Sequence, residues 1–268
     1  MNFKIEFKYL SDVGKSRKTN EDNALVADEL DLAIVADGMG GHNSGEVASK
    51  LAVTVIKEKY ESMIMTQAKP SEYDEKYSPK ANQLVFAIKL ANSVIYEAGN
   101  TADHKGMGTT VSALTLNKDK FSIAHIGDSR IYLLRKKILQ QLTEDHSLVM
   151  EHVKKGFLTK EQANKSPLQN ILTRALGTQK NPAVDIYEIP AEDQDRVILC
   201  SDGLFKAVSE ENIVKIANEN PDNEKACEKL VKTANINGGP DNITVIIGSV
   251  RKKNWKEAVK DMVKKSYA

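Results

Sequence analysis

Apolar runs that border an aspartate recur along the chain and predict buried strands that end at charged positions. The run 32–36 contains only apolar residues and is followed by Asp37 and a glycine-rich turn. An uninterrupted apolar run between turn residues is typical of a strand buried on both faces. Packing gives no reason for a carboxylate at the end of such a strand. Four runs share the arrangement, and they are 32–36 with Asp37, 121–126 with Asp128, 196–200 with Asp202 and, in reverse order, 243–247 with Asp241.

Other patterns predict helices and further strands. Apolar and charged residues alternate over 4–9, which predicts a strand with one buried face. A helix is predicted to begin at Ser44, and its expected buried stripe is Val47, Leu51, Val55 and Ile56. The complete set of predicted helices is 44–60, 84–99, 209–219 and 222–235, and the additional strands are 111–116, 130–135, 138–142 and 184–189.

Two segments differ from the rest of the chain. The stretch 145–177 is polar and weakly periodic, so we expect short helices and mobile segments beside the site there. Residues 1–250 are expected to form one domain, and 251–268 a basic helix or tail with Trp255 and other apolar residues at helical spacing. That C-terminal segment either packs on the domain or docks on a partner or an anionic surface.

Composition and charge exclude several classes of protein. The chain has 268 residues, 41% of them hydrophobic, and a net charge of +1, so nothing indicates a nucleic-acid partner. No apolar run approaches the about 18 residues that a membrane-spanning helix needs. The N-terminus does not have the pattern of a signal peptide. Two cysteines, Cys200 and Cys227, are too few for a disulfide scaffold, which predicts a reduced, cytoplasmic protein.

Aspartates gathered from separate strands indicate a cation site. Like charges that share a site repel one another and are costly to desolvate unless a cation binds among them. The four aspartates offer hard oxygen ligands, which favours Mg²⁺ or Mn²⁺ over Zn²⁺. Two such ions would share a carboxylate and a bridging water, and would prepare that water for in-line attack at phosphorus. Arg17 suits phosphate binding because its guanidinium pairs with two oxygens. A single Asp-Gly pair would indicate only a turn.

The candidate residues belong to short motifs that follow one another along the chain. These motifs are Arg17-x-x-Asn20-Glu21-Asp22, Asp37-Gly38-Met39-Gly40-Gly41, Gly108-Thr109-Thr110, Gly127-Asp128-Ser129-Arg130, Asp145-His146, Ser201-Asp202-Gly203 and Gly239-Pro240-Asp241-Asn242. In order and spacing they resemble the motifs of the metal-dependent protein phosphatases (PPM, or type 2C, serine/threonine phosphatases). The resemblance is greatest to the compact bacterial branch and covers about residues 5–250. One motif alone would be a weak match, but the ordered set is specific.

The resemblance implies a fold and a role for each site residue. The fold would be α+β, a four-layer α/β/β/α sandwich of two antiparallel sheets flanked by helix pairs. Residues 147–175 would correspond to the family's flap, which influences substrate choice. By the resemblance, Asp37 would bridge two Mn²⁺ or Mg²⁺ ions, Gly38 would supply a carbonyl ligand, and Asp202 and Asp241 would complete the ligands of the first ion. Asp128 with Asp202 would form a third-metal position. Glu21 and Asp22 would hold metal-bound waters, Arg17 would bind phosphate and Asn242 would support the site.

The proton donor is the one role that the resemblance leaves open. Many eukaryotic members have a histidine at the position of Met39, whereas bacterial relatives commonly carry methionine there. His42 and His146 are alternatives, although a lone histidine is more often structural than catalytic. A metal-bound water could also donate the proton, and the donor is left unassigned.

The predicted function is hydrolysis of phosphoserine and phosphothreonine in proteins by direct attack of a metal-bridging water or hydroxide. A cysteine-dependent phosphatase is excluded because the residues six positions after Cys200 and Cys227 are Lys206 and Thr233, not arginine. The implied partners are phosphorylated proteins, including a cognate serine/threonine kinase, and a monomer is expected. The alternatives are a catalytically inactive, phosphoprotein-binding relative, and a phosphatase of small phosphoesters or of phosphoserine on sigma-factor regulators.

Overall fold

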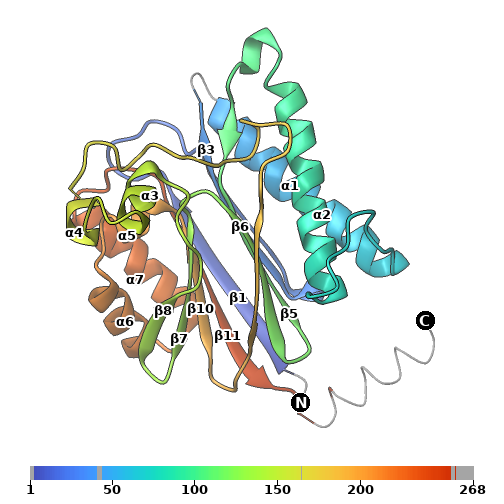
Figure 1. The fold of residues 1–268 in the computed structure, drawn as a ribbon. Coiled ribbons are helices and arrows are strands. Elements are labelled where there is room, and N and C mark those ends of the chain that lie inside the picture. The colour runs from blue at the N-terminus through green and yellow to red at the C-terminus, as the bar shows by residue number, and fades with distance from the viewer. Residues whose placement is uncertain (1–2, 41–43, 164, 255–256, 258–268) are drawn as a thin grey trace.

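Two antiparallel sheets lie face to face in the centre of the protein, with helices on the outer side of each (Figure 1). The structure is a computed structural model and describes residues 3–40, 44–163, 165–254 and 257. Most of the predicted C-terminal helix, 251–268, lies outside the described residues. No helix in the described ranges is both long enough and apolar enough to cross a membrane.

The first sheet contains five strands in the order β1-β11-β10-β7-β8, and every neighbouring pair is antiparallel. Its strands are β1 (Phe3–Asp12), β7 (Arg130–Arg135), β8 (Ile138–Gln141), β10 (Arg196–Cys200) and β11 (Ile243–Lys252). The two terminal strands of the chain, β1 and β11, therefore pair with each other within this sheet.

The second sheet runs in the order β2-β3-β5-β6-β9, and the short strand β4 pairs with β3. Its strands are β2 (Asp22–Ala27), β3 (Leu32–Met39), β4 (Gly108–Thr109), β5 (Val111–Asn117), β6 (Lys120–Ile126) and β9 (Asp185–Pro190). Short 3₁₀ turns at Asp28–Leu30 and Ala102–His104 complete the connections on this side.

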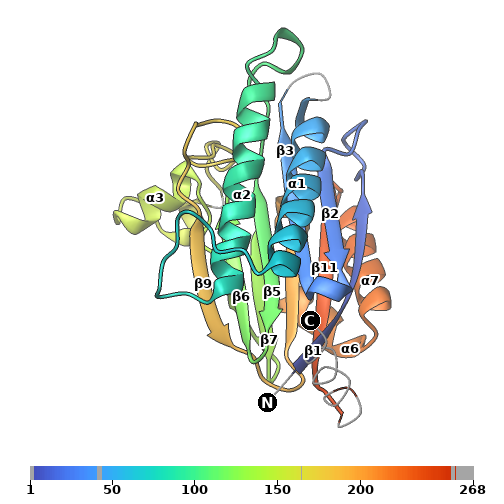
Figure 2. The same ribbon diagram turned by 90° about the vertical axis from the view of Figure 1, so that its right-hand side faces the viewer.

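Helices cover the two outer faces and produce the predicted four layers. Figure 2 shows α1 (Ser44–Thr66) and α2 (Pro79–Ala98) side by side along the second sheet. On the first sheet lie α6 (Glu210–Glu219) and α7 (Asn223–Ile236), with the single-turn helix α5 (Asp202–Phe205) nearby. The buried apolar residues form three clusters, one between each helix layer and its sheet and one between the sheets. The α+β sandwich predicted from the sequence is confirmed.

The apolar runs seen in the sequence are strands whose two faces both contact a core. In β3, Ile34 packs toward α1 and α2, whereas Val35 packs between the sheets. In β10, Leu199 lies between the sheets and Ile198 faces α6 and α7. Strand β1 has one buried face, as predicted, because Ile5 and Phe7 are buried and Glu6 and Lys8 are exposed. Tyr9, which was expected on the buried face, is 49% exposed.

Three helices begin at residues whose side chains cap the first turn, and these helices are α2, α6 and α7. Ser78 accepts a hydrogen bond from the Ala81 N–H at the start of α2, and Pro79 occupies the first helical turn. Ser209 and Asp222 cap α6 and α7 in the same way. All four predicted helices are present, but α2 begins at Pro79 and not at residue 84 as predicted.

Two details of the first helix differ from the sequence prediction. It continues to Thr66 rather than to about residue 60. Its buried stripe is Ala48, Ala52, Ile56 and Tyr60, whereas Val47, Leu51 and Val55 are only partly buried at its edge. The small residues Ala48 and Ala52 allow a close approach of the helix to the sheet, which a pattern weighted toward large apolar residues does not reveal.

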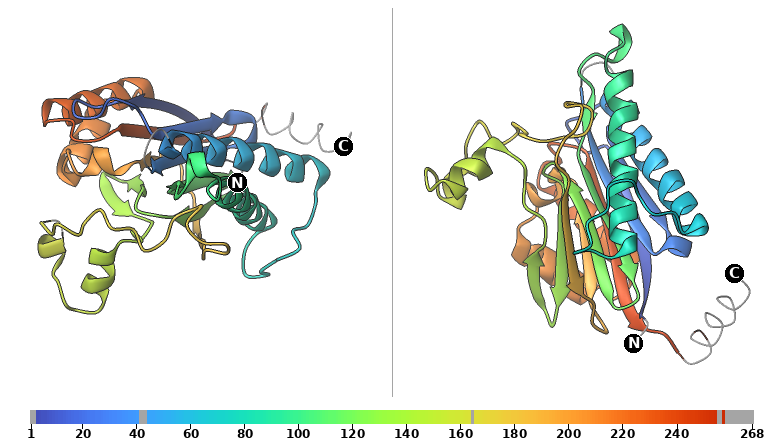
Figure 3. Two further views of the ribbon diagram at one scale, coloured as in Figure 1. Left: turned by 90° about the horizontal axis from the view of Figure 1, so that it is seen from above. Right: turned by 45° about the vertical axis from the view of Figure 1, so that its right-hand side comes forward.

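The 147–175 segment, which we call the flap segment, projects from the body of the protein. It contains the short helices α3 (Leu148–Lys154) and α4 (Lys160–Ala163), shown in yellow-green in Figure 3. A bridge between Ser147 and Leu172 closes its base. Its tip is exposed, and Phe157 has 71% of its surface accessible. The prediction of short helices and little buried core is confirmed.

Candidate active site

The four aspartates highlighted by the sequence lie in four separate parts of the chain. Asp37 lies near the end of β3 and Asp128 lies in the turn between β6 and β7. Asp202 is the first residue of α5, and Asp241 lies in the connection from α7 to β11. A fifth carboxylate, Asp22, pairs with Asp37 across the β2–β3 ladder. The antiparallel topology thus brings together residues separated by more than half the chain.

The carboxylates lie within electrostatic range of one another. Burial raises the pKa of Asp37 well above its usual value, and the charges of Asp22, Asp202, Asp128 and Asp241 raise it further. Burial, with a contribution from Asp202, also raises the pKa values of Asp22 and Asp128 to about 7. Each raised pKa reflects negative charge that water does not solvate, which is the electrostatic setting in which a cation binds favourably.

The backbone of Asp37 is held by the Gly108-Thr109-Thr110 motif. The Thr110 N–H donates to the Asp37 carbonyl at 2.8 Å, and the Thr109 hydroxyl donates to the same oxygen at 2.9 Å. The Asp37 N–H donates to the Thr110 hydroxyl oxygen at 3.0 Å. Thr110 also shares a hydrogen bond of 2.6 Å with Ser129, next to Asp128. The two threonines therefore join β3 to the turn that carries the second aspartate.

Glycines at two positions allow backbone segments of the site to touch. A Cβ on Gly38 would lie 2.1 Å from the Gly45 carbonyl oxygen at the start of α1. A Cβ on Gly203 would lie 2.0 Å from the carbonyl oxygen of Asn242. Any side chain would therefore separate these segments. In the second case the contact brings the Asp202 turn against the Asp241 loop.

Asn242 ties the N-terminal loop of the chain to the same place. Its Oδ1 accepts the Glu21 N–H at 2.8 Å, and its Nδ2 donates to the carbonyls of Val13 and Thr19. All three hydrogen bonds are partly buried, so the amide satisfies several hydrogen-bonding requirements at once. This side chain therefore helps to position the loop that carries Arg17 and Glu21.

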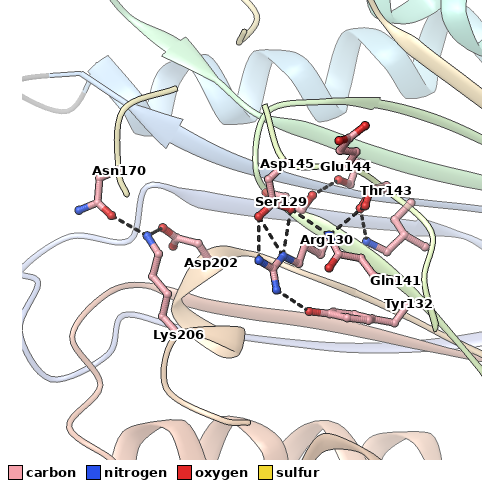
Figure 4. Close-up of polar contacts among 12 residues, drawn as sticks. Ser129, Arg130, Tyr132, Gln141, Thr143, Glu144, Asp145, Asn170, Asp202 and Lys206 are labelled. Atoms are coloured by element: carbon pink, nitrogen blue, oxygen red, sulfur yellow. Dashed lines mark hydrogen bonds and ion pairs between the residues drawn. The ribbon is translucent and has the colours of Figure 1, made fainter. Parts of the chain in front are cut away.

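Cationic side chains face two of the aspartates. Arg17 contacts Asp241 through Nη2 at 3.0 Å and Nε at 2.9 Å. The ammonium of Lys206 binds the carboxylate of Asp202, and it also donates to Oδ1 of Asn170 in the flap segment at 2.7 Å (Figure 4). Lys206 follows Asp202 by four residues, so the single turn of α5 aims the two side chains at each other.

The donor set of the cluster fits a hard divalent cation. The Oδ1 atoms of Asp22 and Asp202 are buried and have no hydrogen-bond partner, so each is free to accept a cation. Oxygen-only ligands suit Mg²⁺ and Mn²⁺. Within the described residues, however, no three Asp, Glu, His or Cys side chains are already arranged to hold an ion. In this arrangement Asp241 and Asp202 instead make ion pairs with Arg17 and Lys206.

A cavity of about 540 Å³ opens beside the aspartates. Arg17, Asp128 and Asp241 line it from the body of the protein, while Gln169 and Asn170 line it from the flap segment. Its polar walls suit a charged ligand rather than an apolar one. The cavity is the space in which a phosphorylated side chain would meet the carboxylates.

The structure also places in this cavity an ion pair that sequence reasoning did not assign. Arg130 makes three hydrogen bonds to the Asp145 carboxylate and donates to the Tyr132 hydroxyl (Figure 4). Its guanidinium also lies 3.7 Å from the Phe205 ring centroid. Both charged side chains are largely buried. Arg130 and Asp145 appeared in the matched motifs, but their pairing depends on tertiary structure. Lys206 was missed, although its spacing from Asp202 was a usable signal.

Of the two histidines considered as proton donors, the structure describes His146 and not His42. The Gly127 N–H donates to Nδ1 of His146, and Nε2 of His146 donates to Asp185 at 3.2 Å. Burial lowers the pKa of this histidine. Because both ring nitrogens are occupied inside the protein, His146 has the environment of a structural residue. His42 lies outside the described residues.

The fold and the acidic, oxygen-lined site define a protein of the metal-dependent phosphatase class. The sequence model "Protein phosphatase 2C" matches residues 15–234, and the chain belongs to this family. It is therefore a protein phosphatase, a phosphoric monoester hydrolase, as the sequence predicted.

Similarity to individual proteins extends over nearly the whole chain. The serine/threonine phosphatase stp of Listeria monocytogenes is 37% identical over 243 residues, which are 90% of this chain and 94% of the relative. The crystal structure of the serine/threonine phosphatase PstP from Mycobacterium tuberculosis has a TM-score of 0.81 and 33% identity, covering 92% of this chain and 99% of that one. A PstP catalytic domain in complex with two manganese ions has a TM-score of 0.78 and 33% identity, covering 93% and 100%.

Proposed function

We propose that this phosphatase hydrolyses phosphoserine and phosphothreonine in proteins with the aid of two bound Mn²⁺ or Mg²⁺ ions. The observation that carries the proposal is the cluster of buried carboxylates around Asp37, which lies beside Arg17 in an open polar cavity. The manganese complex of the similar PstP domain supports the choice of ion.

Each residue of the cluster has a distinct task in this proposal. Asp37, with the carbonyl of Gly38, would hold both ions, and Asp202 and Asp241 would complete the ligands of the first. Bound ions would supply charge neutralisation and lower the pKa of water. Asp22 and Glu21 would orient water, and Asn242 would hold their loop in place. Asp128 is the residue that the resemblance assigns to a third ion and not to these two.

Arg17 would bind and orient the phosphate. Its guanidinium already forms two contacts with a carboxylate, and this planar geometry also matches two phosphate oxygens. About half of its side chain is exposed. An exposed ion pair is worth at most about 1 kcal/mol, so a dianionic phosphate can compete with Asp241 for the guanidinium.

The state of the thiols supports direct hydrolysis, because it argues against a cysteine-bound intermediate. Cys200 and Cys227 are both free and buried, and burial raises the pKa of each thiol to about 12. A thiolate is the reactive form of cysteine, so neither residue can serve as the nucleophile. The proton donor to the leaving group stays unassigned, and His42 remains a proposal for that role.

The setting of the enzyme is proposed from its class. Its partners would be phosphorylated proteins, among them a cognate serine/threonine kinase, and the chain would act as a monomer. Two free, buried cysteines support a reducing compartment such as the cytoplasm.

A phosphopeptide assay tests this proposal directly. Phosphate release from a phosphothreonine peptide should depend on added Mn²⁺ or Mg²⁺, should be abolished by a chelator and should return when the ion is restored. Release from a small aryl phosphate, measured beside it, separates a protein phosphatase from an enzyme for small phosphoesters. Peptide binding without release under every ion condition would instead indicate the catalytically inactive, phosphoprotein-binding alternative. Retention of Asp37, Asp128, Asp202, Asp241 and Arg17 argues against that alternative.

A further inference from the structure

The positively charged ammonium of Lys206 lies against the carboxylate of Asp202, one of the aspartates of the cluster. Its ammonium binds Asp202 and is held on its other side by Asn170 of the flap segment (Figure 4). Only 24% of the Lys206 side chain and 12% of the Asp202 side chain are exposed. The lysine is therefore not a solvated surface charge but a partly buried group fixed by two partners.

The same ammonium lies on one cavity with Asp128. Asp128, Asn170 and Lys206 all line the cavity of about 540 Å³ beside the aspartates. The ammonium that binds Asp202 therefore faces the same space as the carboxylate of Asp128. The lysine lies where Asp128 and Asp202 together would otherwise need a cation.

We propose that the ammonium of Lys206 takes the place of a third divalent ion between Asp128 and Asp202, so that the enzyme binds two ions and not three. This inference rests on the proposed two-ion site and assigns Lys206 as a positioning residue of it. A tethered cation is present at every ion concentration, and it repels a further divalent ion from the same two carboxylates. Through Asn170 it also links the flap segment to the acidic cluster.

The turn of α5 explains why the lysine reaches this place. The Lys206 N–H donates to the Asp202 carbonyl at 2.9 Å, which fixes the backbone between them. Phe205, between the two, is held against Arg130. With the turn fixed and its neighbour anchored, Lys206 and Asp202 lie on one face of the helix, within reach of each other.

Counting bound ions tests the inference. The full-length protein is titrated with MnCl₂, and free Mn²⁺ is measured by electron paramagnetic resonance until binding is complete. The wild-type protein should bind two ions. Lys206→Gln and Lys206→Ala should each bind a third, whereas Lys206→Arg, which keeps the charge, should bind two. Lys154→Gln is the matched control, because Lys154 pairs with Glu144 away from the aspartates, and it should also bind two.

A double variant locates the additional ion. Lys206→Gln with Asp128→Asn should return to two ions, because one of the two freed carboxylates is then lost. Circular dichroism melting confirms that each variant is folded before its ions are counted. Two ions in folded Lys206→Gln and Lys206→Ala, or three in the wild-type protein, would overturn the inference while leaving the proposed function intact. Fewer than two ions in the wild-type protein would overturn both.

Discussion

The guanidinium of Arg17 and the carboxylate of Asp241 are 224 residues apart in sequence and make two contacts, at 2.9 and 3.0 Å, in the fold. This pair joins the proposed phosphate-binding residue to a proposed metal ligand. Under the proposed roles, phosphate binding to Arg17 or ion binding to Asp241 would break this contact. Phosphate binding and ion binding are therefore expected to influence each other through this contact.

Arg17→Ala should weaken substrate binding more than it slows turnover. A hydrogen bond between charged groups contributes about 1.5–3 kcal/mol, so loss of the guanidinium should raise KM for a phosphopeptide about 10- to 100-fold. Steady-state kinetics at saturating Mn²⁺ measure this change. Lys18→Ala, which removes a neighbouring exposed cation, should leave KM unchanged. A large fall in kcat at unchanged KM would contradict the assigned role of Arg17.

Asp37→Asn should abolish ion-dependent turnover while the fold survives. The variant removes the buried carboxylate on which four other aspartates act, so it relieves repulsion when no ion is bound. We expect a melting temperature without ions at least equal to that of the wild-type protein. Added Mn²⁺ should raise the melting temperature of the wild-type protein and have a smaller effect on the variant, because a ligand stabilises only the state that binds it.

The matched control for this experiment is Asp28→Asn, at an exposed position in the turn before β3. It should retain both turnover and the full stabilisation by Mn²⁺. Equal stabilisation of Asp37→Asn and the wild-type protein would show that Asp37 does not hold the ion.

Asp145→Ala should destabilise the protein strongly. Arg130 would keep its buried position but lose the three hydrogen bonds that Asp145 accepts. Removing one partner of a buried ion pair costs about 3–5 kcal/mol, because the remaining charge is uncompensated. Urea denaturation measures the change. Glu144→Gln breaks an adjacent but exposed pair with Lys154 and should cost less than about 1 kcal/mol. Similar losses for the two variants would contradict the buried-pair interpretation.

His125 should make the fold sensitive to acid. It is fully buried, bonded to Ser112 and to the Glu144 carbonyl, and burial lowers its pKa from 6.5 to about 3. Between these two values the unfolded chain binds a proton that the folded protein does not. The contribution of neutral His125 is therefore complete above about pH 6.5, and it is lost as the pH falls toward 3, by up to about 1.4 kcal/mol per pH unit.

Urea denaturation across this pH range tests the prediction. His125→Asn should flatten the acid side of the stability curve, even if the variant is less stable at neutral pH. His152→Asn, in α3 of the flap segment, is the control and should reproduce the wild-type slope. An unchanged slope in His125→Asn would assign the acid sensitivity to other groups.

Much of the fold was predictable because its local patterns agree with its tertiary environment. The runs that form β3 and β10 are apolar on both faces, so the unbroken apolar pattern indicated strands that lie between two packed layers. Ser209 and Asp222 cap α6 and α7 at the predicted starts, by chemistry that is local to the chain. The start of α2 at Ser78 was missed, because the apolar spacing used to predict that helix begins only at Leu84. The buried face of α1 was less predictable, because close packing there depends on alanines that carry little hydrophobic signal.

The residue types of the site were determined by the sequence, and their partners only by the fold. Asp37, Asp128, Asp202 and Asp241 stand beside apolar runs, so an acidic site was visible before any contact was known. Their mutual repulsion, the buried pair of Arg130 with Asp145 and the contact of Lys206 with Asn170 required the tertiary structure. Electrostatic energies depend on distance and burial, and neither quantity is written in the order of the residues.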